Sequence, residues 1–103
     1  MNRNKADSQI PVVITTSLDL PPLWGRLAAL SPTEAELVSH FELPAGKMVA
    51  LAFDLGGAGF EDVRARIKKA ARDAHGYYNY ELAFVDPAQG ALLKSAIARA
   101  TPR

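Results

Sequence analysis

The amino-acid sequence predicts a mainly β domain that ends in an α-helix. Apolar residues occupy every second position in residues 63–67 and again in residues 78–84, which is the period of a half-buried strand. After Asp86-Pro87 the apolar spacing changes to that of a helix. A chain of 103 residues has room for one hydrophobic core, so we predict a single domain over residues 10–100 with flexible tails at 1–9 and 101–103.

Three strands are predicted in the first half of the chain. Residues 12–16 are rich in β-branched side chains, and Pro21-Pro22 ends their pairing. Residues 23–29 are interpreted as a second strand. Residues 47–54 alternate between two faces that are both largely apolar, so we expect this strand to be well covered. The glycine-rich residues 56–59 are predicted to form a turn.

The second half is predicted to contain a β-hairpin and the final helix. Residues 63–68 also fit one stripe of a helix, but their strict alternation places three apolar side chains on one face and three cations on the other, which favours a strand. Residues 78–84 alternate in the same way after a turn at 74–76. In the final helix, Asp86 is predicted as the N-cap and Pro87 as the first helical residue.

Residues 31–41 fit two different structures. Ser31-Pro32-Thr33-Glu34 has the form of a capping box, and Leu37, Val38 and Phe41 have helical spacing, so local propensity favours a helix. A strand over residues 35–41 would show only loose alternation. The residues alone leave both structures open.

Composition excludes several classes of protein. A formal net charge of +1 provides no long-range field to collect nucleic acid or anionic lipid. The absence of cysteine rules out disulfides and thiolate metal sites. The polar N-terminal residues lack a secretory signal, and no apolar run is long enough to span a bilayer. We therefore expect a cytoplasmic protein without membrane insertion.

No combination of side chains in the sequence predicts catalysis. His40 and His75 are the two histidines, and a metal site would have to recruit scattered carboxylates around them. Ser31 has none of the glycines that flank a hydrolase nucleophile, and no pair of carboxylates stands out as an acid and a base. We expect a protein that is not an enzyme and that carries neither a metal nor a cofactor.

Two groups of residues are candidates for an interaction surface. Arg64, Arg66 and Lys68 form the densest local charge and precede three tyrosines, an arrangement that can bind single-stranded nucleic acid, although a solvated face over a tyrosine-rich core is the simpler interpretation. Trp24 lies at the start of the second strand with Arg26 on the same face. That pair can pack in the core or offer stacking and charge to a partner.

The order of the predicted elements resembles a PilZ domain. The likeness covers roughly residues 10–100 and depends on the spacing from Ser31 to Gly46 and on the closing segment of residues 76–84. It implies a small six-stranded antiparallel β-barrel with a C-terminal α-helix. It also implies that residues 35–40 form a strand in spite of their helical propensity.

The PilZ family binds cyclic di-GMP through an RxxxR pair and a D/NxSxxG turn, and this sequence departs from both. In the turn only Ser31 matches, because the acid is replaced by Ala29 and the glycine by Glu34. Arg3 is followed four residues later by Asp7 in place of the second arginine. Each lost charge-assisted contact is worth about 1.5–3 kcal/mol. We therefore expect no binding of cyclic di-GMP by the usual route.

The resemblance implies a regulatory or adaptor domain in bacterial signalling, motility or type IV pilus systems. We expect it to act through protein contacts, with a protein of unidentified type as the partner. A cyclic di-GMP receptor with a non-standard site and a small β-barrel that binds single-stranded nucleic acid are the alternatives, of which the nucleic-acid binder is less favoured.

Overall fold

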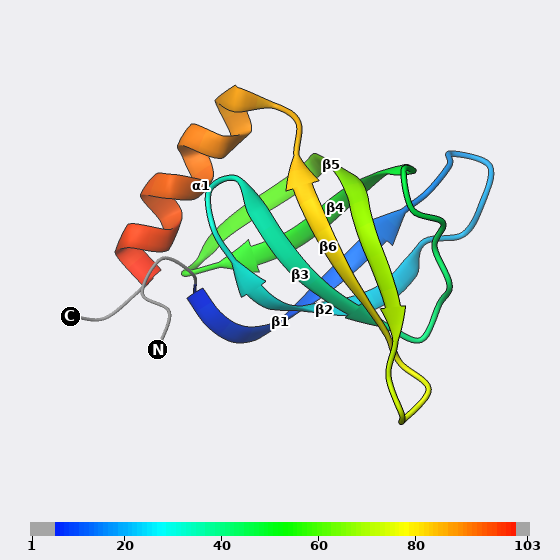
Figure 1. The fold of residues 1–103 in the computed structure, drawn as a ribbon. Helices are drawn as coiled ribbons and strands as arrows, with labels where there is room; N and C mark the ends of the chain where they lie inside the picture. The colour runs from blue at the N-terminus through cyan, green and yellow to red at the C-terminus, as the bar shows by residue number, and fades with distance from the viewer. Residues whose placement is uncertain (1–5, 101–103) are drawn as a thin grey trace.

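The chain folds as a closed antiparallel β-barrel with one helix at its end (Figure 1). A computed structural model describes residues 6–100, and the barrel order is β1-β2-β3-β6-β5-β4. The elements are β1 (Ala6–Thr15), β2 (Leu23–Leu30), β3 (Glu34–Ser39), β4 (Met48–Leu55), β5 (Ala58–Arg72), β6 (Tyr78–Phe84) and α1 (Pro87–Ala100). The mainly β class, the six strands and the C-terminal helix are as predicted.

Residues 34–39 form a strand, so the helix favoured by local propensity is wrong for this segment. β3 pairs with β2 on one side and with β6 on the other, and Ala35 and Leu37 enter the core. Two complete ladders outweigh the weak helical preference of so short a segment. The strand implied by the PilZ resemblance is therefore confirmed.

Two strands, β1 and β5, extend well beyond their predicted boundaries. β1 begins at Ala6, so residues 6–9, predicted as tail, belong to a strand that pairs with β2. The predicted tails at residues 1–5 and 101–103 lie outside the described residues. β5 begins at Ala58, because the β4–β5 turn needs only Gly56 and Gly57, whose φ angles of 59° and 86° suit a tight hairpin.

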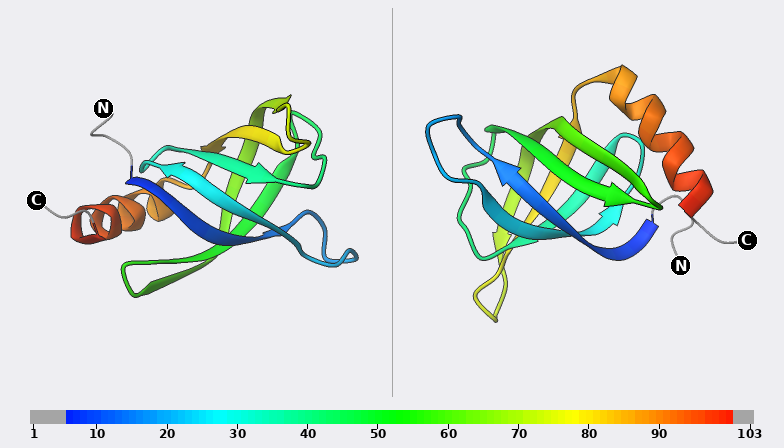
Figure 2. Two further views of the ribbon diagram at one scale, coloured as in Figure 1. Left: turned by 90° about the horizontal axis from the view of Figure 1, so that it is seen from below. Right: turned by 180° about the vertical axis from the view of Figure 1, so that it is seen from behind.

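The helix closes one end of the barrel, and Figure 2 shows it across that end from two further directions. The N-cap is as predicted: the Asp86 carboxylate accepts a hydrogen bond from the Ala88 backbone N–H at 3.0 Å. Leu93 and Ala96 are buried in the barrel core. The Gln89 side chain donates to the Asp62 carbonyl at 2.9 Å and so ties the helix to β5.

The far end of the barrel is held by Tyr80. Its ring is 2% exposed, and its hydroxyl donates to the Phe41 carbonyl at 2.6 Å and accepts from the Leu43 N–H at 2.7 Å. These bonds fasten the β3–β4 loop to β6, and they satisfy the polar end of a buried tyrosine. No helix among residues 6–100 is both long enough and apolar enough to cross a membrane.

Candidate functional surfaces of the barrel

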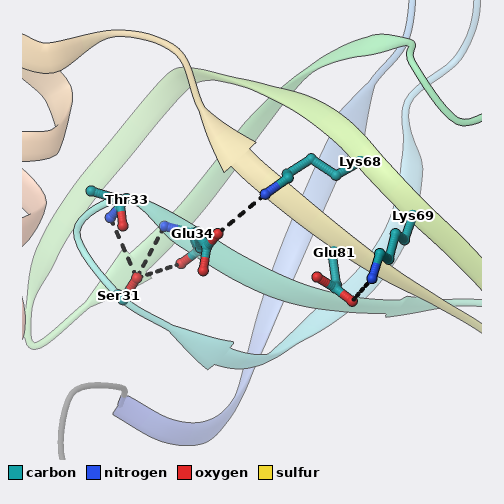
Figure 3. Close-up of polar contacts among 6 residues, drawn as sticks. All are labelled: Ser31, Thr33, Glu34, Lys68, Lys69 and Glu81. Atoms are coloured by element: carbon teal, nitrogen blue, oxygen red, sulfur yellow. Dashed lines mark hydrogen bonds and ion pairs between the residues drawn. The ribbon is translucent and has the colours of Figure 1, made fainter.

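Ser31 is the one residue that matches the PilZ ligand turn, and the turn itself uses its hydroxyl. Ser31 Oγ accepts from the Glu34 N–H at 3.0 Å and from the Thr33 N–H at 3.4 Å, and it lies 3.1 Å from the Glu34 carbonyl, to which it can donate (Figure 3). The Ser31 N–H also donates to that carbonyl, at 2.8 Å. The apparent capping box is therefore the tight turn of the β2–β3 hairpin.

A depression of about 560 Å³ beside this turn is acidic. Glu34, Glu36 and Glu81 line it, with Lys69 as its one cation, and Ala28 borders it from β2. Glu36 and Glu81 are direct cross-strand partners, an arrangement that is unfavourable for two carboxylates. We call this surface the acidic depression.

Two lysines of β5 pair with carboxylates of the acidic depression (Figure 3). Lys68 Nζ lies 3.4 Å from Glu34 Oε2, and Lys69 Nζ lies 4.0 Å from Glu81 Oε2. All four side chains are about half exposed or more, so water screens these pairs and each stabilises the fold by at most about 1 kcal/mol. In both pairs the positive charge of the lysine faces a carboxylate of the acidic depression.

The predicted cations Arg64, Arg66 and Lys68 lie in a row along the outer face of β5, as the alternation required. Arg64 lies 3.8 Å from the Asp62 carboxylate, and Lys68 has the partner described above. Tyr78 and Tyr80 point the other way, toward the core. The aromatic platform that nucleic-acid binding would need is therefore not formed by these two tyrosines.

Trp24 and Arg26 lie on the outer face of β2, and the structure adds two residues to them. Trp24 is 63% exposed. Arg26 lies with its Cζ 5.4 Å from the centre of the Tyr77 ring, and the His40 ring is 4.2 Å from Tyr77, centre to centre. These four side chains line a depression of about 350 Å³. We call it the Trp24 site.

Buried contacts behind the Trp24 site hold its strands in place. Ser39 is 2% exposed, and its hydroxyl donates to the Trp24 carbonyl at 2.8 Å and accepts from the Phe41 N–H at 3.2 Å. Tyr77 is placed by the β5–β6 turn, where its N–H donates to the Asp73 carboxylate at 3.0 Å. His40 and Tyr77 were not predicted for this surface, because β3 and the β5–β6 turn bring them to Arg26 only after the sheet has closed.

The structure separates the residues of the predicted interaction surface into two faces. β2 carries Trp24 and Arg26, whereas β5 carries the row of cations, and these strands lie three apart in the barrel in either direction. Ala29 and Ser31 lie at the far end of β2 from Trp24, at the hairpin turn. Among the side chains that the structure describes, no three His, Asp or Glu side chains are arranged so that they could hold one metal ion.

Comparison with known proteins gives matches by structure. No family model matches the sequence, and no curated protein matches it. Solved structures do match: the inhibitor of motility MotI/DgrA of Bacillus subtilis has a TM-score of 0.69 and 16% identity over 96% of this chain and 51% of its own. YcgR of Escherichia coli in complex with cyclic di-GMP has a TM-score of 0.70 and 18% identity over 93% of this chain and 44% of its own.

The PilZ domain of YcgR taken alone aligns over nearly its full length. It has a TM-score of 0.68 and 16% identity, and the alignment covers 95% of this chain and 91% of the domain. The chain therefore spans about half the length of MotI and YcgR and corresponds to their PilZ portion. At identities this low, the structural match establishes the fold and nothing more. The fold of this chain is that of a PilZ domain.

Proposed function

We propose that this chain is a non-catalytic regulatory domain that acts through protein contacts and does not bind cyclic di-GMP by the usual PilZ route. The observation that carries the proposal is Glu34. It occupies the position of the motif glycine, and its carboxylate lines the depression next to the turn.

The surroundings of Glu34 support the same conclusion. An anionic dinucleotide at this turn would meet the carboxylates of Glu34 and Glu81 at close range. Like charges placed side by side oppose binding, and water and the two lysine partners reduce this repulsion without reversing it. Ala29 provides no side-chain acceptor for a guanine edge, and the Ser31 hydroxyl already serves the turn. Removing one obstacle would leave the others in place.

Calorimetry with cyclic di-GMP tests the proposal directly. The PilZ domain of YcgR, whose structure contains cyclic di-GMP, provides the positive control. We expect a saturable signal from YcgR and none from this chain at micromolar concentrations. Stoichiometric binding at micromolar affinity or tighter would overturn the proposal.

The faces available for protein contact are the Trp24 site and the cation row of β5. One solved structure with this fold is an inhibitor of motility, and this supports motility control as a process in which to test the domain. Pull-down with the chain and its Arg66→Glu variant tests the β5 face. Loss of a specific partner from the variant assigns that face, and identical partners exclude it.

A further inference from the structure

We propose that the Trp24 site binds an acidic peptide segment of a protein partner, in which one carboxylate pairs with Arg26 and a neighbouring apolar side chain packs against Trp24. This inference rests on the proposed function, because it names the chemistry by which such a domain recognises its partner.

Arg26 is held in position while part of its guanidinium stays open. The Nε–H donates to Gln9 Oε1, and the planar group lies over the Tyr77 ring. No ion pair to Arg26 occurs among the side chains that the structure describes. A guanidinium has further N–H donors at its outer end, and they match a carboxylate in bidentate geometry. Because Arg26 is already ordered, binding costs less side-chain entropy.

The charge of the site matches a single carboxylate. The residues that line it include no Asp or Glu, and Arg26 is the one permanent charge among them. Nucleic acid requires a row of cations that follows successive phosphates, and this lining does not supply one. An acidic side chain on a peptide needs one fixed cation.

The rest of the surface provides apolar contact beside that charge. Trp24 stands between two depressions, because it also lines one of about 320 Å³ with the apolar residues Val13, Ala52 and Phe60 and the acidic residues Asp54 and Glu61. The two acids repel a peptide carboxylate, so this second depression accepts only apolar side chains of the peptide. Pro11 borders both depressions, and Val38 lies under the Trp24 site. An exposed tryptophan next to an ordered arginine has the composition of an interface hot spot. Apolar side chains of a peptide can therefore pack on either side of the indole.

The sheet limits how a peptide can bind here. β2 pairs with β1 and β3, and β3 pairs with β2 and β6, so neither strand under the site has a free edge. Addition of a strand to β2 or β3 is therefore excluded. The side chains must carry the recognition.

Trp24 itself reports the binding, because it is the single tryptophan of the chain. The probes are two blocked pentapeptides, Gly-Phe-Glu-Phe-Gly and the same peptide with glutamine in place of glutamate. We expect the acidic peptide to change the Trp24 fluorescence saturably and the glutamine peptide to bind roughly ten- to a hundredfold more weakly. Arg26→Gln should cause the same loss, and Arg99→Gln, the same exchange on the helix, should cause none.

Each result decides between the proposals. Equal affinity for both peptides, or no binding of either to the wild-type chain, overturns this inference, and so does a Trp24 response to oligothymidylate in place of the peptides. In these cases the proposed function stands as long as calorimetry detects no binding of cyclic di-GMP. Because the two peptides are compared on the wild-type chain, the test does not depend on the folding of any variant. Binding of cyclic di-GMP would overturn the proposed function itself.

Discussion

Gly25 lies between the two main residues of the Trp24 site and faces the core. A Cβ at this position would come within 2.8 Å of the Val38 carbonyl oxygen and 3.1 Å of Leu37 Cδ1. Backbone cannot yield as a flexible side chain does, so β2 and β3 would have to separate. The glycine thus allows the close strand approach on which the geometry of the site depends.

We expect Gly25→Ala to lower the free energy of unfolding by about 1–3 kcal/mol, the usual range for overpacking a core. Urea denaturation followed by circular dichroism measures the change. Gly59→Ala is the matched control, because its added Cβ would meet only the flexible side chain of Asp54, at 3.2 Å. An unchanged midpoint in Gly25→Ala would show that the strands can separate without cost.

Ionisation of Tyr80 lowers the stability of the fold at alkaline pH. Desolvation raises the pKa of Tyr80, whereas its hydrogen bond with Leu43 lowers it, and the pKa lies above the ordinary value of 10.0. The unfolded chain therefore loses this proton first as pH rises, so stability is full below pH 10 and falls between the unfolded and the folded pKa. In Tyr80→Phe the denaturation midpoint should therefore fall less than in the wild-type chain as the pH rises above 10. A decline identical to that of the wild-type chain would assign it to other groups.

At the scale of elements, the β5–β6 turn depends on Asp73. Desolvation raises the pKa of this carboxyl, but bonds from the His75 and Tyr77 N–H groups and from the Asn79 amide lower it more, and the pKa lies below 3.8. The bonds to the carboxylate measure 2.8, 3.0 and 3.3 Å. The turn is therefore stabilised above the ordinary carboxyl pKa and loses that support as pH falls through the lowered one.

We expect Asp73→Ala to speed amide hydrogen exchange at His75 and Tyr77 by about tenfold, because each N–H loses its carboxylate acceptor. Exchange followed by NMR measures this change, and the amides of β1 serve as the internal control. Slow exchange at Tyr77 in the variant would show that the turn holds without the carboxylate.

The elements that the sequence predicted best were those whose pattern is local. Residues 63–68 and 78–84 alternate because their faces are either core or solvent, and that alternation needs no knowledge of neighbours. Residues 31–34 wrongly indicated a helix start, because a serine hydroxyl accepts from the N–H three residues later both in a helix cap and in this hairpin turn. Only pairing with β2 and β6 distinguishes the two structures.

The candidate site was predicted only in part, for a different reason. Trp24 and Arg26 share a face by simple alternation, so the pair was visible in the sequence. Tyr77 and His40 reach it through strand registers that include bulges, as between Leu27 and Ala29. A register shift of one residue reverses the face of every later side chain, and no local pattern specifies it.

At the scale of the whole molecule, the helix acts as the closure of the barrel. Leu93 is fully buried while its neighbour Leu92 is 62% exposed. Leu93→Ala should therefore lower the free energy of unfolding by about 2–5 kcal/mol, whereas Leu92→Ala should change it by less than about 0.5 kcal/mol. Thermal and urea denaturation of the pair measure the difference. Equal effects would mean that the helix does not rely on core burial.

Charge is distributed unevenly although the net charge is +1. The acidic depression lies over β3 and β6, and the lining of the Trp24 site carries a single permanent cation and no acid. The domain therefore offers neighbouring surfaces of opposite sign along the β2–β3 hairpin, and Val38 lines both. An acidic segment at the Trp24 site would be repelled from the acidic depression, which orients it.

β1 and β4 close the barrel through only three register pairs, Val13 with Ala52, Ile14 with Leu51 and Thr15 with Ala50. Every other neighbouring pair of strands shares a longer ladder. Thermal fluctuation will part the cylinder along this shortest junction before any other. The edges of β1 and β4 would then carry unpaired backbone hydrogen-bonding groups, while β1 stays paired with β2, so β1 of one opened copy can pair with β4 of another.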